Sequence, residues 1–517
     1  MKILFATSEA VPFAQTGGLA DVSHSLPVSL AAQGQDVAVI MPAYQQIESG
    51  KYPLEPTNIT LEIPVGTKIK KGTVLKGSFP DAKVPVYFVK HDDYYHREGL
   101  YNNKGNDYSD NCERFIFFCR SVLETIRLLN LDIDIIHAND WQTGLIPAYL
   151  ELLYKKHSRF NVQKNAESPY MFDDAIIEGE SSSSDLSFDS IHSVFTIHNM
   201  RHQGRFSHWD MLQTGLDWKY FTFDMMEFYG QLNLLKTGMI FADKITTVSP
   251  RYAEEIQTEA FGEKLHGVLQ YRRQDLTGIL NGIDINEWNP ATDPNLVAPY
   301  DINTVFENKP KCKAALQKEM GLPLNNDVPL FGIVSRFDSQ KGLDLVIDVA
   351  EFWIQRHGIQ LAVLGTGERK LEERFLKLAQ QFPQNVSVQI RYQNALSHRI
   401  EAGADIFLMP SRYEPCGLNQ MYSQRYGTLP LVRETGGLAN TIINASNETM
   451  ANQTANGFSF FWGTADEMNK AIDWAIKCYF ERKPEWKQMI QTAMKQDHSW
   501  NRSALHYMNL YQELLNK

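Results

Sequence analysis

The chain has 517 residues, of which 43% are hydrophobic, and its formal net charge is −11. This length predicts two large domains or three ordinary ones, and the acidic balance argues against nucleic acid or an anionic membrane as a partner. The five cysteines lack metal-ligand spacing, and no apolar run is long enough to span a bilayer. Strand-like residues follow Met1 directly, so we expect no targeting peptide and a reduced, cytoplasmic protein.

Apolar runs typical of buried strands alternate with helical spacing through the first 280 residues. The first βαβ unit combines a strand over residues 2–8, a helix from Leu19 to Gly34 and a strand over residues 36–41. Their continuous apolar character predicts a parallel sheet that is covered on both faces. Further strands are expected over residues 84–89, 133–137, 193–198 and 244–248.

Residues 165–190 interrupt this alternation. The segment contains four consecutive serines at 181–184 and several acids, and no Lys or Arg occurs between Lys164 and Arg201. This composition predicts a low-complexity acidic loop at the surface of the first domain. A phosphorylated or partner-binding segment is the alternative.

A second α/β pattern follows a turn at residues 281–284 and a loop rich in Asn, Asp and Pro. An amphipathic helix is expected over residues 500–515. We therefore predict an N-terminal domain of residues 1–280, a C-terminal domain of residues 281–490 and a final segment of residues 491–517. The strands of the second domain are expected over residues 329–335, 361–364, 386–390, 406–409 and 429–432.

Two nearly identical hexapeptides lie far apart in the chain, TGGLAD at residues 16–21 and TGGLAN at residues 435–440. Each follows an apolar strand and opens a stretch with helical spacing. Free backbone N–H groups and the helix dipole at such a turn favour an anion. The pair predicts two α/β halves that bind one phosphorylated, polyhydroxylated ligand.

Charged side chains follow two strands of the second domain. Arg336 and Lys341 lie at the carboxyl end of a strand, where open α/β sheets bind ligands. A guanidinium fork and a mobile ammonium suit a pyrophosphate, although two solvated basic residues are the alternative. Glu414 precedes Pro415, which keeps it out of the helical region, and Gly417 permits a close approach to a ligand. The Glu414 carboxylate can hold sugar hydroxyls, or it can be a helix cap.

Two polar side chains end strands of the first domain. Asp140 precedes a helix expected over residues 144–150, and a helix N-cap explains it well. His198 ends the strand at residues 193–198, where a structural histidine is the alternative to a catalytic one. No cluster has metal-ligand spacing, so we expect neither a metal nor a cofactor. Arg336, Lys341 and the two Gly-Gly turns can neutralise phosphates instead.

Together these motifs resemble the glycogen synthase/starch synthase family of glycosyltransferases, family 5. The resemblance implies a GT-B fold, an α/β fold in which two Rossmann-like domains face each other across a cleft and the final helix crosses back to the N-terminal domain. It implies transfer of glucose from a nucleotide-glucose, usually ADP-glucose, to the 4-hydroxyl of an α-1,4-glucan, with retention of configuration and no metal. The matching residues run over nearly the whole chain: SE at 8–9, TGGLAD at 16–21, HN at 198–199, VSP at 248–250, LNGID at 280–284, SR at 335–336, QKGLD at 340–344, SHRI at 397–400, PSR at 410–412, EPCGL at 414–418 and TGGLA at 435–439.

The resemblance implies a role for individual residues. Arg336 and Lys341 would bind the donor phosphates and stabilise the departing diphosphate, and Glu414 would hold the donor glucose. His198 and Asp140 would orient the transferred glucose, and the leaving phosphate would take the acceptor's proton. Further donor contacts would come from Gln15, Gly17, Gly18, Asn281, Tyr392 (against the base), Cys416, Gly417, Leu418, Thr435, Gly436 and Gly437.

This chain departs from the family pattern at three places. Gln15 replaces the Lys that opens the first glycine-rich motif, and glutamine cannot neutralise a phosphate. Asn139 stands where many bacterial members carry a His, and residues 165–190 are an insertion. We expect an active α-1,4-glucan synthase with altered donor affinity. The alternatives are a glucan-binding or regulatory protein with weak or no turnover, which Gln15 supports, and a dinucleotide-dependent oxidoreductase, whose G-x-G-x-x-G spacing is missing.

Overall fold

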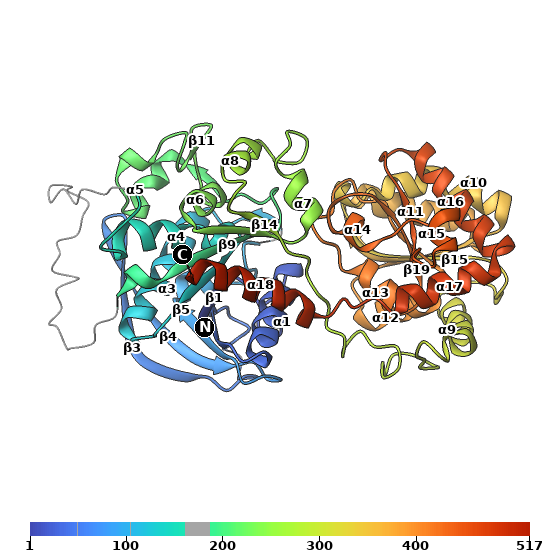
Figure 1. Ribbon diagram of the computed structural model, residues 1–517, viewed down its shortest axis with the longest axis horizontal. Helices are drawn as coiled ribbons and strands as arrows, with labels where there is room; N and C mark the ends of the chain where they lie inside the picture. Colours follow the sequence, from blue (N-terminus) through green and yellow to red (C-terminus); the bar gives the residue numbers. More distant parts are fainter. Residues whose placement is uncertain (49, 104, 161–186, 517) are drawn as a thin grey trace. The chain divides into compact units, whose positions relative to one another are not determined.

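The computed structural model of this chain describes residues 1–48, 50–103, 105–160 and 187–516 (Figure 1). The chain divides into two units, each built around its own sheet. Unit 1 comprises Met1–Val248, Ala253–Ile279 and Ser503–Lys517, and unit 2 comprises Ser249–Tyr252 and Leu280–Arg502. Most of the expected acidic insertion, residues 165–186, lies outside the described residues.

The sheet of unit 1 has nine strands in the order β14-β13-β9-β8-β1-β2-β5-β4-β3. All neighbours pair in parallel except β4, which is antiparallel to both β5 and β3. The topological switch point lies between β1 and β8, which is the usual place for a ligand at the carboxyl edge. The strands are β1 (Lys2–Ala6), β2 (Asp36–Pro42), β3 (Glu55–Val65), β4 (Lys68–Ser78), β5 (Pro85–Lys90), β8 (Ile135–Asn139), β9 (His192–Ile197), β13 (Lys244–Thr247) and β14 (Leu276–Gly278).

Helices cover this sheet, and a small antiparallel sheet of β10 (Arg205–Ser207), β12 (Gln231–Asn233) and β11 (Glu227–Phe228) lies beyond them. Figure 1 shows α18, drawn in dark red, beside the strands of unit 1. The Tyr511 hydroxyl of α18 lies 2.7 Å from Nδ1 of His137 in β8, and the helix belongs to unit 1 from Ser503 onward. Helices that pack in or around this unit include α1 (Gly18–Ala32), α3 (Asn111–Leu128), α4 (Leu145–Tyr149), α6 (Leu234–Phe241), α7 (Pro250–Glu255), α8 (His266–Tyr271) and α18 (Trp500–Leu515).

The sheet of unit 2 has six parallel strands in the order β17-β16-β15-β18-β19-β20. Numbered along the chain, this is the 3-2-1-4-5-6 order of a Rossmann sheet, and its switch point lies between β15 and β18. The strands are β15 (Leu330–Phe337), β16 (Gln360–Gly367), β17 (Val386–Ile390), β18 (Ile406–Met409), β19 (Leu429–Arg433) and β20 (Phe458–Phe460). The helices are α9 (Val305–Glu319), α10 (Leu343–His357), α11 (Arg369–Gln381), α12 (Asn394–Gly403), α13 (Asn419–Arg425), α14 (Gly436–Thr441), α15 (Asn447–Ala451), α16 (Ala465–Glu481) and α17 (Lys483–Met494).

Helix α10 shows how the sequence places the loops that carry function. Its apolar residues recur at helical spacing, so Leu343, Val346 and Trp353 are all buried in the core of unit 2. The helix ends at Gly358, whose φ of +63° suits a left-handed C-cap. It begins directly after Gly342, and the short turn between the end of β15 and Gly342 carries Lys341 of the candidate site.

The predicted strands are present, with ends shifted by a few residues. The sequence pattern missed the short edge strands β14 and β20, and it missed β3 and β4, the antiparallel extension at one edge of the unit 1 sheet. Exposed and half-buried residues alternate along much of β3 and β4, so these strands contain no continuous apolar run that would predict them. The helix expected over residues 144–150 is shorter, because α4 ends at Tyr149 and gives way to a π-helical turn.

Candidate functional site

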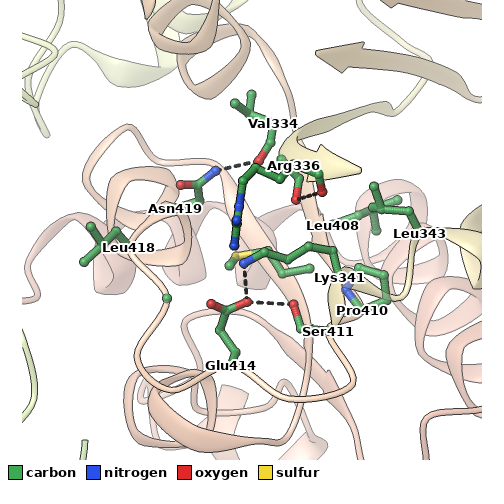
Figure 2. Close-up of a pocket in the computed structure, with 13 residues that line it drawn as sticks. Val334, Arg336, Lys341, Leu343, Leu408, Pro410, Ser411, Glu414, Leu418 and Asn419 are labelled. Atoms are coloured by element: carbon green, nitrogen blue, oxygen red, sulfur yellow. Dashed lines mark hydrogen bonds and ion pairs between the residues drawn. The ribbon is translucent and has the colours of Figure 1, made fainter. Parts of the chain in front are cut away.

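A pocket of about 180 Å³ opens at the switch point of the unit 2 sheet. Its wall includes residues from both β15 and β18, as Figure 2 shows. Ligands of doubly wound sheets bind at this position. The lining residues are Val334, Ser335, Arg336, Lys341, Leu343, Leu408, Met409, Pro410, Ser411, Glu414, Gly417, Leu418 and Asn419.

An ion pair lies inside this pocket. The ammonium of Lys341 lies 2.7 Å from Oε2 of Glu414, and the Ser411 hydroxyl donates to the same oxygen at 2.9 Å. The two charged side chains are only 19% and 8% exposed, so water screens them weakly. Oε1 of Glu414 has no partner in the part of the chain that the structure describes. It is therefore available to a hydroxyl of a ligand.

Arg336 adds a second positive charge at the mouth of the pocket. Its side chain is 66% exposed, and its nearest ion-pair contact is Asp338 at 3.7 Å. Asp338 in turn accepts the backbone N–H of Lys341 at 3.2 Å and so fixes the short turn between the two basic residues. Gly342 closes this turn with φ +62°, and a Cβ there would lie 2.2 Å from the Pro410 carbonyl. The turn thus holds a guanidinium and an ammonium where an anion can contact both.

The second Gly-Gly turn packs against the loop that carries Glu414, and it does not present open N–H groups to a ligand. The Gly437 N–H is already shared between the carbonyls of Glu414 and Pro415, at 3.2 and 3.1 Å. A Cβ at Gly436 would lie 1.9 Å from the Glu414 carbonyl, and one at Gly437 would lie 2.1 Å from the Cys416 carbonyl. The prediction of free N–H groups is therefore wrong for Gly437. The glycines let the loop that carries Glu414 pack directly on the turn.

Four other predicted residues of unit 2 do not line the pocket: Cys416, Asn281, Tyr392 and Thr435. Cys416 is buried, and burial raises the pKa of its thiol to about 12, although the backbone N–H of Asn281 favours the thiolate. Asn281 is therefore next to this loop, and its own Oδ1 is buried without a partner among the described residues. Tyr392 follows β17 and is 84% exposed, and neither it nor Thr435 lines the pocket.

In unit 1, the residues at the end of β8 hold His198. The backbone N–H of His198 donates to Oδ1 of Asp140 at 2.7 Å, and its ring Nε2 lies 3.0 Å from Oδ1 of Asn139. Asp140 has φ +56° and its side chain caps no helix, so the predicted N-cap is wrong. The sharp turn after β8 directs the carboxylate to the end of β9 instead. Burial raises the pKa of Asp140 to about 7, against the backbone N–H groups that favour its charged form.

The first Gly-Gly turn binds an internal carboxylate that the sequence reasoning gave no role. Glu9 follows β1, and its Oε2 accepts the backbone N–H of Thr16 at 2.5 Å and that of Gly17 at 3.4 Å. The Tyr101 hydroxyl donates to the other oxygen at 2.8 Å. Burial raises the pKa of Glu9, and these hydrogen bonds oppose the rise. The prediction of open N–H groups is therefore wrong for Thr16 and Gly17, because the acid that follows β1 binds both.

Gln15 and Gly18 are the exposed part of the same turn. The Gln15 amide lies 3.3 Å from both carboxylate oxygens of Asp21. A Cβ at Gly18 would meet nothing within 4 Å, so this glycine leaves open space at the start of α1. The structure brings Asp140 and His198 together in unit 1, and Lys341 and Glu414 together in unit 2. Gln15 also lies in unit 1, where it contacts Asp21.

The burial of His198 predicts a pH dependence of stability. Burial lowers its pKa from 6.5 to about 3, so the native ring stays neutral while an unfolded chain protonates near pH 6.5. Its contribution to stability is present above pH 6.5 and is lost as the pH falls toward 3. Relative to the wild type, His198→Gln should therefore gain about 1–2 kcal/mol in free energy of unfolding between pH 8 and pH 5. Denaturant titrations at both pH values measure this, and a stability difference that is constant with pH would contradict it.

No helix in the described ranges is long and apolar enough to cross a membrane. In the same ranges, no group of three or more His, Cys, Asp and Glu side chains is arranged to hold a metal ion.

The chain matches two protein-family models. Residues 2–166 and 177–271 match the starch synthase catalytic domain, and residues 317–496 match glycosyl transferases group 1. The glycogen synthase of Rhodopirellula baltica is 41% identical over 521 residues, covering 99% of this chain and 97% of the relative. The glycogen synthase of Thermotoga maritima is also 41% identical, covering 100% of this chain and 99% of the relative.

A solved structure matches as well. The catalytic domain of starch synthase IV from Arabidopsis thaliana, bound to ADP and acarbose, superposes with a TM-score of 0.85 at 30% identity. The match covers 100% of this chain and 99% of that one. The predicted GT-B fold, with two Rossmann-like domains, is confirmed by this similarity and by the two parallel sheets.

Proposed function

Because this chain belongs to the glycogen and starch synthase family of glycosyltransferases, we propose that it elongates an α-1,4-glucan with glucose from a nucleotide-glucose, and that ADP-glucose is its preferred donor. The transferred glucose keeps its α configuration in this proposal. The similar starch synthase structure is bound to ADP, the diphosphate that ADP-glucose leaves behind, which supports this choice of nucleotide.

The observation that carries the proposal is the pocket of unit 2. It places two positive side chains, Arg336 and Lys341, beside one fixed carboxylate, Glu414, at the switch point of a Rossmann sheet. Cations suit the diphosphate, and a carboxylate with a free oxygen suits sugar hydroxyls. A dinucleotide-dependent oxidoreductase would need neither this pair nor this carboxylate.

Each residue then has one task in the transfer. Negative charge develops on the diphosphate as the bond to the glucose breaks, and Arg336 and Lys341 stabilise this charge because they are already in place. Glu414 holds the glucose through Oε1 while Ser411 and Lys341 occupy Oε2. The leaving phosphate oxygen takes the proton of the acceptor hydroxyl, which then attacks from the same face. His198 and Asp140 are proposed to contact or position the transferred glucose.

Asn281 offers a further polar contact near this loop. Its Oδ1 is buried without a hydrogen-bond partner among the described residues, and such an atom costs about 1–3 kcal/mol when it stays unpaired. A hydroxyl of the donor is the kind of group that would satisfy it. We therefore keep Asn281 in the proposed donor site, with Gly417 and Leu418 as its walls.

Incorporation of labelled glucose into glycogen tests this function. ADP-glucose and UDP-glucose are offered separately at equal concentrations, and label in the polymer is counted. We expect incorporation from both or from ADP-glucose alone, with a higher kcat/KM for ADP-glucose. Equal or faster use of UDP-glucose would contradict the donor assignment. The absence of incorporation from either donor would contradict the function and favour the glucan-binding or regulatory alternative.

Replacing Gln15 by Lys is expected to raise kcat/KM for the donor by about threefold to tenfold. A hydrogen bond from a charged group to phosphate is stronger than one from an amide, by about 1 kcal/mol or more. Asp21, 3.3 Å from the Gln15 amide, would pair with the new ammonium and reduce the gain. Steady-state kinetics shows whether the charge acts on KM or on kcat. Gln15→Met is the neutral control, and unchanged values of both parameters in Gln15→Lys would refute the account of this position.

A further inference from the structure

We propose that Asn139 is a positioning residue that fixes which nitrogen of the His198 ring carries the proton. The role of His198 in transfer rests on the proposed function, whereas the state of its ring rests on hydrogen-bond geometry alone. Asn139 ends β8 and is fully buried, and His198 follows the adjacent strand β9.

Two backbone carbonyls fix the orientation of the Asn139 amide. Nδ2 of Asn139 lies 3.1 Å from the Ala6 carbonyl and 3.2 Å from the His137 carbonyl. Carbonyl oxygens only accept hydrogen bonds, so the NH₂ group must face them. A flipped amide would bring its oxygen against two other oxygens in a buried place, which is unfavourable. The amide oxygen Oδ1 therefore faces His198.

The oriented amide then fixes which nitrogen of the His198 ring carries the proton. Oδ1 of Asn139 lies 3.0 Å from Nε2 of His198, and an amide oxygen can only accept. Nε2 must therefore carry the proton. A neutral imidazole has one N–H, so Nδ1 carries a lone pair. Nδ1 has no hydrogen-bond partner within the described ranges, and it remains free to accept.

Asn139 and Asp140 thus bind the ring and the backbone of the same histidine. Asn139 holds the ring, and Asp140 accepts the backbone N–H of His198 at 2.7 Å. Because the Asn139 amide also binds Ala6 of β1, one side chain ties together the carboxyl ends of β1, β8 and β9. Rotation of the ring or transfer of its proton would break the hydrogen bond to Asn139.

This arrangement determines what His198 can recognise. With only an acceptor nitrogen available, the ring can bind a hydroxyl O–H, but it cannot donate to a phosphate oxygen. The geometry therefore directs His198 to a hydroxyl of the transferred sugar and away from the diphosphate. Asn139 acts through His198 and does not itself need to contact the substrate.

Nitrogen-15 NMR of the histidine rings in the full-length protein tests the inference without any turnover. The chain has 14 histidines, and the cross-peaks that disappear in His198→Gln identify the ring of interest. We expect the wild-type His198 ring to be neutral with the proton on Nε2. A ring with the proton on Nδ1, or a mixture of the two forms, would overturn the inference.

The variant Asn139→Leu removes the amide at nearly constant volume. We expect its His198 ring to lose the single protonation pattern, and kcat to fall about tenfold with a donor KM within about twofold. The matched control is Thr196→Val on the neighbouring strand, because Thr196 contacts His137 and not His198. In Thr196→Val the His198 spectrum should be unchanged. An unchanged His198 spectrum in Asn139→Leu would refute the positioning role.

The two proposals fail in different ways. A wild-type protein with the proton on Nε2 but no glucose transfer would refute the proposed function and leave the state of the ring established. A protein that transfers glucose with the proton on Nδ1 would refute the role of Asn139 and leave the proposed function intact.

Discussion

Replacing Lys341 by Met is expected to lower kcat by about 10²–10³-fold. The ammonium lies in the pocket beside Glu414, where the proposed diphosphate leaves. Charge on the leaving group grows toward the transition state, so the lost cation should reduce kcat more than it raises the donor KM. Steady-state kinetics with a saturating glucan measures both parameters. A kcat within about threefold of the wild type would contradict the role of Lys341.

The same substitution also leaves Glu414 without its ionic partner. The Glu414 side chain is 8% exposed, and we expect a loss of about 2–3 kcal/mol in stability, less than for a fully enclosed pair because the pocket is open. Adding Glu414→Gln removes the unpaired charge and should restore most of this stability but none of the activity. Lys377 is an exposed lysine of α11 in the same unit, and Lys377→Met is the control for the loss of a charge. A double variant no more stable than Lys341→Met would show that the two side chains are not coupled.

Replacing Gly437 by Ala should lower kcat by about 10²-fold or more and cost several kcal/mol in stability. The new Cβ would lie 2.1 Å from the Cys416 carbonyl and 2.6 Å from the Cys416 Cα, both backbone atoms. The loop that carries Glu414 must therefore move by about 1 Å, a displacement that can cost about 10²-fold in rate. Thermal unfolding and steady-state kinetics measure the two effects. Wild-type stability and rate in this variant would contradict the close packing of the loop on the turn.

The first Gly-Gly turn supplies the matched comparison. Gly18 occupies the position that corresponds to Gly437, but a Cβ there meets nothing within 4 Å. Gly18 is the first residue of α1, so the free energy of unfolding of the Gly18→Ala protein should be unchanged or raised by up to about 1 kcal/mol. A donor KM that rises in this variant would then report the approach of a ligand, because packing is unaffected. A destabilised Gly18→Ala would contradict the distinction between the two turns.

The sequence located the pocket because its residues follow strands. Arg336 and Glu414 each come after an apolar run, and the carboxyl ends of parallel strands share one edge of a sheet. What the pattern could not give was the pairing of β15 with β18, which brings Lys341 to 2.7 Å from Glu414. Strand order depends on contacts between residues far apart in the chain, and no local spacing encodes it.

The twin hexapeptides show where local reasoning failed. TGGLAD and TGGLAN differ by one residue, and both begin helices, yet one turn binds the internal carboxylate of Glu9 and the other packs on the Glu414 carbonyl. These partners come from β1 and from the loop after β18, not from the turns themselves. The N-cap alternative for Asp140 failed for the same reason, because the partner of its carboxylate is a backbone N–H at the end of the neighbouring strand.

The balance between glucose transferred and diphosphate released tests the central claim most directly. Wild-type protein is incubated with ADP-glucose and glycogen, and both products are quantified in the same sample. The account predicts equal amounts of ADP and polymer-bound glucose, with all of the new glucose released by a hydrolase specific for α-1,4 linkages. ADP formed without growth of the glucan, or neither product formed, would contradict it.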